Sequence, residues 1–88
     1  MDLNLVVLCG KLREVETKRL GYKRSAVWLH MDINDGELVT VEWHASDDDL
    51  ETIDPKAGDR LWVSGKVSED IVVAAHVQKV EVDDEAAS

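Results

Sequence analysis

Residues 3–12 have the pattern of a β-strand with apolar residues on both faces. Alternate residues of a strand point to opposite sides, so one face holds Asn4, Val6, Leu8, Gly10 and Leu12, and the other holds Leu3, Leu5, Val7 and Cys9. A chain of 88 residues can bury one such face in its own core but has little material for a second layer. The pattern therefore predicts a small β-barrel whose second face contacts another copy of the chain. A central strand covered by the chain's own helix is the alternative.

The composition is typical of one soluble domain, with an apolar fraction of 44%. No apolar run approaches the length of a membrane span, and Asp2 precedes the first apolar stretch with no basic region before it, unlike a signal peptide. The single cysteine, Cys9, excludes an internal disulfide. We expect a cytoplasmic protein with one domain over residues 1–82 and a short, acidic, flexible C-terminus at residues 83–88.

The net charge of −9 is unevenly distributed along the chain. The first 25 residues hold six cations and three acids, a local charge of +3, which leaves −12 for the remainder. Nucleic-acid-binding proteins usually present a basic surface, but a ligand that touches one surface responds to the local potential there. The charge therefore leaves nucleic-acid binding open.

Turn signals and alternation divide the chain into five strands and one helix. The strands are expected at residues 4–16, 26–33, 37–44, 60–67 and 71–82. Residues 17–25 are expected to form a polar, basic connection that turns at Gly21, and Asn34-Asp35-Gly36 is a tight hairpin signal. Ser46 is a good helix N-cap, and Pro55 ends the helix after about two turns. Three strands, a helix and two strands predict an all-β, five-stranded oligonucleotide/oligosaccharide-binding (OB-fold) barrel.

Four segments resemble the bacterial single-stranded-DNA-binding protein family. They are Asn4-x-Val6-x-Leu8-x-Gly10-x-Leu12, Trp43 before the helix, the turn and strand from Lys56-Ala57-Gly58-Asp59 to Val67, and the closing segment 72–77. Together they extend over most of the chain. The resemblance implies a barrel that forms a dimer or tetramer in part through its first strand and stacks bases on exposed aromatic rings.

The chain also departs from that family's pattern. The connections after the second and fourth strands are short here, whereas the family usually has long basic arms there. The family's long tail with an acidic-apolar tip is also missing, because Val82-Asp83-Asp84-Glu85 has no terminal aromatic residue. These departures keep a second function class open, an acidic protein-interaction module on the same fold.

Single-stranded DNA binding requires aromatic faces for bases and cations for phosphates. The predicted nucleic-acid-binding residues are Trp28, His30, Tyr22, Trp62, Lys18, Arg19, Lys23 and Arg24. Alternation points Trp28 and His30 away from the core, while covering the barrel or contacting a subunit is the other interpretation for Trp28. Trp62 fits a capping or interface role as well as stacking. Alternation places Trp43 in the core, unless a bulge turns it outward.

No catalytic arrangement, Gly-rich phosphate loop or zinc-ligand spacing occurs in the sequence. We therefore expect no enzyme activity, metal, cofactor, small-molecule substrate or membrane partner. The expected function is weak, salt-sensitive binding of single-stranded DNA with little sequence preference, in replication, repair or recombination. The alternative is an acidic OB-fold interaction module or nucleic-acid mimic that binds little or no nucleic acid.

Overall fold

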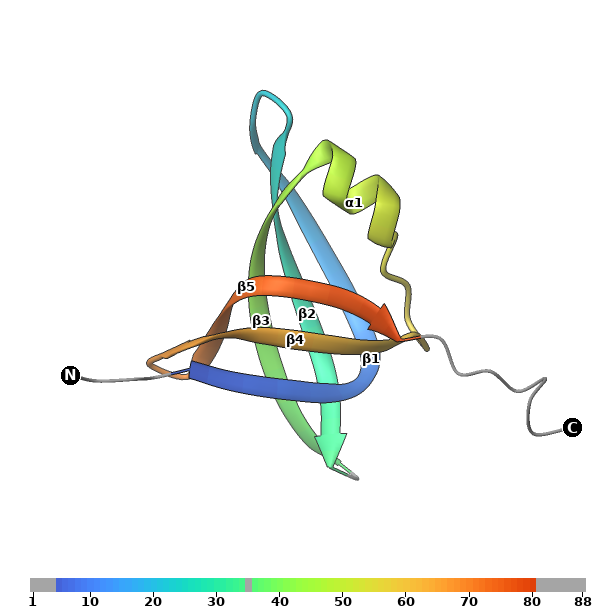
Figure 1. The fold of residues 1–88 in the computed structure, drawn as a ribbon, viewed down its shortest axis with the longest axis vertical. Helices are drawn as coiled ribbons and strands as arrows, with labels where there is room; N and C mark the ends of the chain where they lie inside the picture. The colour runs from blue at the N-terminus through green and yellow to red at the C-terminus, as the bar shows by residue number, and fades with distance from the viewer. Residues whose placement is uncertain (1–4, 35, 81–88) are drawn as a thin grey trace, which may run out of the picture.

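The computed structural model describes residues 5–34 and 36–80. These residues form a closed five-stranded barrel with one short helix between the third and fourth strands (Figure 1). In chain order the elements are β1 (Leu5–Gly21), β2 (Arg24–Asn34), β3 (Glu37–Ser46), α1 (Asp47–Ile53), β4 (Arg60–Ser68) and β5 (Ile71–Val80). Around the barrel the strands follow the order β1-β2-β3-β5-β4. The OB-like barrel predicted from the sequence is confirmed.

Strand β1 belongs to both halves of the barrel. Its first part, from Leu5 to Lys11, pairs with β4, and the part from Lys11 to Gly21 pairs with β2. The strand changes partners next to Gly10, where the backbone of β1 comes very close to that of β2. A Cβ atom at Gly10 would lie 2.5 Å from the carbonyl oxygen of Asp32. Only glycine permits this approach.

The core follows from alternation over residues 27–31 of β2 and 41–45 of β3. Val27, Leu29 and Met31 of β2 are fully buried, and they face Val41 and other apolar residues of β3. From the other strands the core receives Leu12, Leu61, Val63, Val72 and Val77. Trp43 is only 5% exposed, so the prediction that it lies in the core is confirmed.

The first two strands are longer than the sequence suggested. Residues 17–25 were expected to form a loop, but β1 continues to Gly21 and β2 begins at Arg24. The turn lies at Tyr22 and Lys23, not at Gly21, and Lys23 adopts a left-handed conformation with φ 58°. Thr17 pairs with Val27 and Gly21 with Arg24, so backbone hydrogen bonds keep this polar segment in a β-strand conformation. We call residues 17–26 the arm; it projects beyond the barrel beside α1 (Figure 1).

Helix α1 has the ends that the sequence predicted. The Ser46 hydroxyl accepts a hydrogen bond from the Asp49 backbone N–H at 3.1 Å, which makes Ser46 the N-cap. Three aspartates occupy the first turn, where the helix dipole favours negative charge. Asp54 closes the helix in a left-handed conformation just before Pro55.

The connection between α1 and β4 is fastened to β1. The Leu12 N–H donates to the Asp59 carbonyl at 2.7 Å, and the Gly58 N–H donates to the Leu12 carbonyl at 2.8 Å. The Asp59 carboxylate accepts a hydrogen bond from the Lys56 backbone N–H and forms an ion pair with Lys79 at 3.1 Å. The Lys56 N–H, followed by Lys79, lowers the pKa of Asp59 below its usual value.

The junction between β3 and β5 is the shortest in the barrel. These strands run parallel and pair only through Val41–Val72 and Glu42–Val73. Beyond that point α1 packs on β3 and β5. A hollow of about 130 Å³ remains there, lined by Trp43, Asp49, Ile53, Ala75, His76 and Val77. It is well below the usual size of a small-molecule site.

Replacing Gly65 by alanine should destabilise the barrel. Gly65 is buried at an irregularity between β4 and β5, and a Cβ atom there would collide with the carbonyl oxygen of Val73. Gly65→Ala should lower the free energy of unfolding by about 1–3 kcal/mol, measured by urea denaturation followed through tryptophan fluorescence. Gly21→Ala is the matched control, because no atom lies within 4 Å of that Cβ position. Equal stability of the two variants would contradict the close approach.

Candidate nucleic-acid interface

The outward side chains of β2 and β3 form the face on which barrels of this architecture bind ligands. We call it the β2–β3 outer face; it consists of Trp28, His30, Thr40, Glu42 and His44. Register sets its pairs: Trp28 lies opposite Glu42, and His30 lies opposite Thr40. The other neighbour of β2 is β1, which places Glu14 and Glu16 opposite His30 and Trp28. The sequence prediction that Trp28 and His30 point away from the core agrees with these positions.

Trp28 is partly buried on this face. Its indole N–H donates a hydrogen bond to the Glu42 carboxylate at 3.2 Å. The ring is therefore oriented by a carboxylate on one neighbouring strand and has Glu16 opposite it on the other. It offers an aromatic surface in an acidic setting.

Histidine–glutamate contacts complete the face. His30 Nε2 lies 2.8 Å from Glu16, and His44 Nε2 lies 2.9 Å from Glu42. With neutral histidines the face carries net negative charge, which opposes a phosphate directly above it.

The arm supplies the opposite electrostatic character. Tyr22 at its tip is 84% exposed, and the Lys23 ammonium lies 5.2 Å from the centre of the Tyr22 ring. Lys18 and Arg24 are also exposed, and neither makes an ion pair with any residue in the described ranges. The structure thus brings Lys18, Tyr22, Lys23 and Arg24 together on one hairpin.

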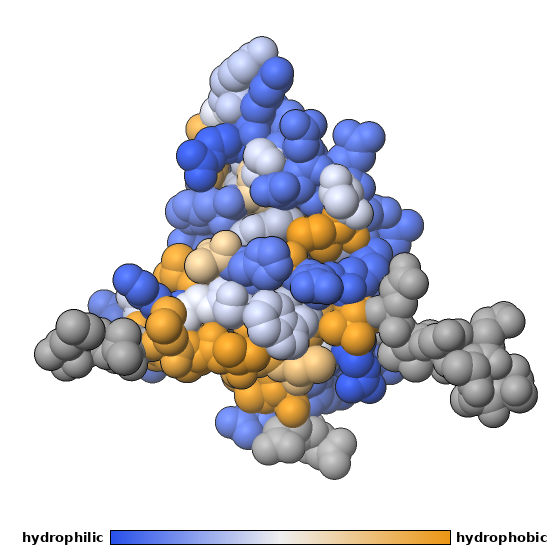
Figure 2. All heavy atoms as spheres, in the orientation of Figure 1, coloured by the Kyte–Doolittle hydropathy of each residue, from blue (hydrophilic) through white to orange (hydrophobic). Residues whose placement is uncertain are grey.

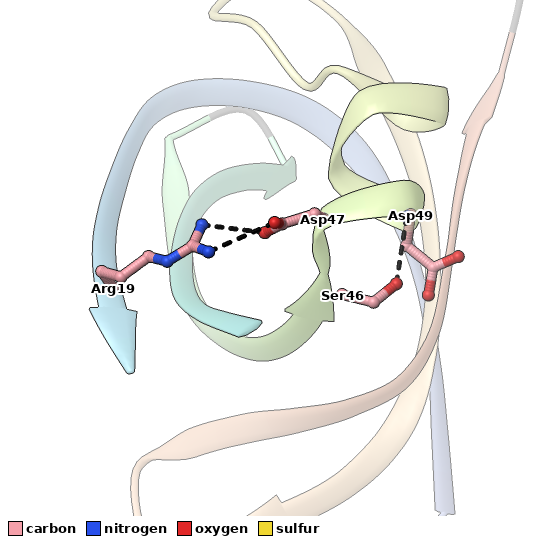
Figure 3. A network of polar contacts seen from close by, with 4 residues as sticks. All are labelled: Arg19, Ser46, Asp47 and Asp49. Atoms are coloured by element: carbon pink, nitrogen blue, oxygen red, sulfur yellow. Dashed lines mark hydrogen bonds and ion pairs between the residues drawn. The ribbon is translucent and has the colours of Figure 1, made fainter. Parts of the chain in front are cut away.

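Arg19 is the arm cation with a defined partner. Its guanidinium donates to both carboxylate oxygens of Asp47 in the first turn of α1, at 2.9 and 3.2 Å (Figure 3). The neighbouring Ser46–Asp49 cap holds that turn in place, and the Asp47 N–H donates to the Lys23 carbonyl at 3.1 Å. These contacts join the arm to the helix. Arg19 would have to leave Asp47 to contact a phosphate.

Trp62 lies apart from the other predicted site residues. It is on β4, partly buried, paired with Cys9 of β1 and in edge-to-face contact with His76 at 6.0 Å between ring centres. Strand β1 separates β4 from β2, so the structure does not bring Trp62 together with Trp28.

Leu5, Val7 and Cys9, which belong to the predicted oligomer face, are exposed; Leu3 lies outside the described residues. Leu5 and Val7 are 64% and 61% exposed, so the chain's own helix does not cover them. Apolar side chains gather where β1, β4 and β5 cross the face shown in Figure 2, whereas the arm and the helix are mostly hydrophilic there. The alternative of a strand covered by α1 is therefore wrong for these residues.

Sequence reasoning did not select the three glutamates of this region, Glu14, Glu16 and Glu42. Their alternation with apolar neighbours predicts that they point outward, but their contact with Trp28 and His30 depends on strand register. The hairpin signal at residues 34–36 pairs β2 with β3, but a register shift between Asp32 and Asn34 moves the pairing by one residue and places Glu42 opposite Trp28. The sequence predicts a loop at residues 17–25, and a loop there sets no register between Glu14 or Glu16 and β2.

Comparison with known proteins adds no family to this picture: neither a scan of protein-family models nor a search of curated proteins finds a match to this chain. Among the described residues, no helix has the length and apolar character needed to cross a membrane. The interpretation of the site therefore depends on its geometry.

The Arg19–Asp47 contact should contribute measurably to stability. A double-mutant cycle of Arg19→Ala and Asp47→Ala, followed by urea denaturation, should give a coupling of about 0.2–1 kcal/mol, as for other exposed ion pairs. A cycle of Arg24→Ala with Asp47→Ala is the control and should give a smaller coupling, because Arg24 lies beside Asp47 but makes no hydrogen bond or ion pair with it among the described residues. Coupling indistinguishable from the control would show that backbone pairing alone positions the arm.

Proposed function

We propose that this protein binds single-stranded DNA weakly and without strong sequence preference. Bases stack on Tyr22 of the arm and on Trp28 of the β2–β3 outer face, and Lys18, Lys23 and Arg24 contact the phosphates. The observation that carries the proposal is the arm tip, where a tyrosine that is 84% exposed lies among cations beside the ligand-binding side of an OB-like barrel.

Tyr22 packs on no described core residue, and its described contact is with the neighbouring Lys23. Its ring face is therefore open to a stacked base. Lys23 beside the ring offers a cation to the phosphate of a stacked nucleotide. Ring and cation together form the minimal unit for binding one nucleotide.

The carboxylates on the β2–β3 outer face and beside it on β1 are the reason that we propose weak binding. Glu14, Glu16 and Glu42 repel phosphates, so the backbone of the strand runs toward the arm while a base reaches Trp28. Three phosphate contacts on single-stranded DNA predict a slope of about −2 for log K against log salt. The role is to cover exposed strand in replication, repair or recombination, with no chemical step.

A second candidate is supported by the same carboxylates. Glu16, Glu42 and the oriented indole of Trp28 form an acidic patch with an aromatic centre, which suits a basic partner protein. In that case the β2–β3 outer face is a protein-interaction surface and nucleic-acid binding is negligible.

Titration of fluorescein-labelled oligo-dT at low salt, followed by anisotropy, separates the two functions. The parent protein should bind, and Tyr22→Ala and Trp28→Ala should each weaken binding about tenfold, since a stacked base contributes about 1–3 kcal/mol. Lys66→Ala is the control, because this exposed cation lies on β4, away from the arm. Absence of binding at high micromolar protein would reject DNA binding and favour the interaction module. Unchanged binding by both aromatic variants would show that DNA binds at a different surface.

We also propose that two copies associate through the first part of β1. Residues 5–10 are paired with β4 on one side and with no described strand on the other, and they expose Leu5, Val7 and Cys9. An unpaired edge with an apolar face is self-complementary, because the same edge of a second copy can pair with it about a two-fold axis. A small barrel gains burial from this contact.

Light scattering after size exclusion should therefore report a dimer or a larger even assembly. Val7→Asp should convert it to a monomer, because a carboxylate would be buried in the contact. Leu38→Asp is the matched control: Leu38 is 63% exposed, against 61% for Val7, but lies on β3. A monomeric parent protein, or equal effects of the two variants, would contradict association through β1.

A further inference from the structure

We propose that Glu14, Glu16 and His30 bind one divalent transition-metal ion, with Zn²⁺ as the best match. Each residue offers one ligand atom, and these three atoms all lie within 4.8 Å of one another. The site is on the outside of the barrel, where β1 and β2 pair. It does not depend on the proposed binding of DNA.

Strand register brings the three ligands together. Glu14 and Glu16 are two residues apart on β1 and point to the same side, and His30 of β2 lies directly opposite Glu14. A register shift in β1 between Leu12 and Glu14 sets this alignment. Two paired strands therefore hold all three ligands, a firmer support than a loop.

The ligand set suits zinc better than magnesium or calcium. Zn²⁺ accepts imidazole nitrogen and carboxylate oxygen at about 2.0–2.2 Å, so its ligand atoms lie roughly 3.4 Å apart in a tetrahedral site. The separations in the structure bracket that value, from 2.8 Å between His30 Nε2 and Glu16 to at most 4.8 Å for the other pairs. Magnesium and calcium prefer oxygen ligands only, and a site with one imidazole disfavours them.

A neighbouring residue already orients the histidine. His30 Nδ1 lies 3.3 Å from the Thr40 hydroxyl, while Nε2 faces Glu16 at 2.8 Å. Without metal, the Nε2–H donates to Glu16; when zinc binds, the proton is on Nδ1, which donates a hydrogen bond to the Thr40 hydroxyl, and the Nε2 lone pair goes to the ion. Ligating histidines commonly have such a partner on their second nitrogen.

The charges leave a role for a cation. His30 contacts Glu16, but Glu14 makes no hydrogen bond or ion pair with any residue in the described part of the chain. Two carboxylates and a neutral imidazole together carry −2, which one divalent ion balances. Bringing both carboxylates to one ion also removes their mutual repulsion.

The His44–Glu42 pair on the β2–β3 outer face is a control for the His30 site. His44 and Glu42 make the same kind of contact, at 2.9 Å, without a third ligand among the described residues. If a histidine–glutamate pair were sufficient, both places would bind zinc equally. If three ligands are required, only the His30 site binds it.

Isothermal titration of the folded protein with Zn²⁺ near neutral pH tests the proposal without DNA. All the proteins compared, including the parent, carry Cys9→Ser, because the exposed Cys9 thiol is itself a zinc ligand. The parent should bind one ion per chain, Glu14→Gln and His30→Gln should each weaken binding at least tenfold, and the control His44→Gln should stay within twofold. Mg²⁺ at the same concentration should not compete.

Thermal unfolding provides the second measurement, since an ion that binds only the folded chain raises the midpoint. Zn²⁺ should raise the midpoint of the parent and of His44→Gln equally, and should raise that of His30→Gln by clearly less at the same concentration. Circular dichroism of the metal-free variants verifies that each is folded. Absence of Zn²⁺ binding up to millimolar concentration, or equal binding by His30→Gln and the parent, would overturn the proposal. Either result would leave the oligo-dT experiment unaffected.

Discussion

Closure of this barrel depends on two close backbone approaches, β1 to β2 at Gly10 and β4 to β5 at Gly65. Backbone atoms occupy the space that a side chain would need at either position, so neighbouring strands can bend sharply without leaving their ladders. The close approach at Gly10 lies next to Lys11, where this one long strand passes from pairing with β4 to pairing with β2. The core, the arm and both outer surfaces follow from the path of β1.

That path separates the surface into regions of different character. The first part of β1 exposes Leu5, Val7 and Cys9 beside β4, whereas its second part adds Glu14 and Glu16 to the face of β2 and β3. Beyond the barrel the same strand becomes the basic arm, joined to α1 by Arg19. The surface of a chain with net charge −9 therefore includes an apolar edge on β1, an acidic face on β2 and β3, and a cationic arm tip.

Much of the architecture could be predicted because it depends on local patterns. Alternation located the core of β2 and placed Trp43 inside and Trp28 outside, and the Ser46 cap and Pro55 located the helix. The arm was missed because Thr17 to Gly21 carry no apolar alternation; backbone pairing alone makes them strand. The Arg19–Asp47 contact and the cluster of Glu14, Glu16 and His30 join residues distant in sequence, so they require a register that spacing along the chain does not contain.

The short pairing between β3 and β5 has a consequence for how the barrel moves. Only two residue pairs join these strands, whereas β2–β3 and β4–β5 pair along most of their length. Separation of β3 from β5 breaks the fewest backbone hydrogen bonds. Opening of the barrel into a curved sheet therefore requires the least free energy at this junction. Because α1 follows β3 directly, it would stay with that strand, and Trp43, which already lines the hollow beside α1, would gain exposure to water.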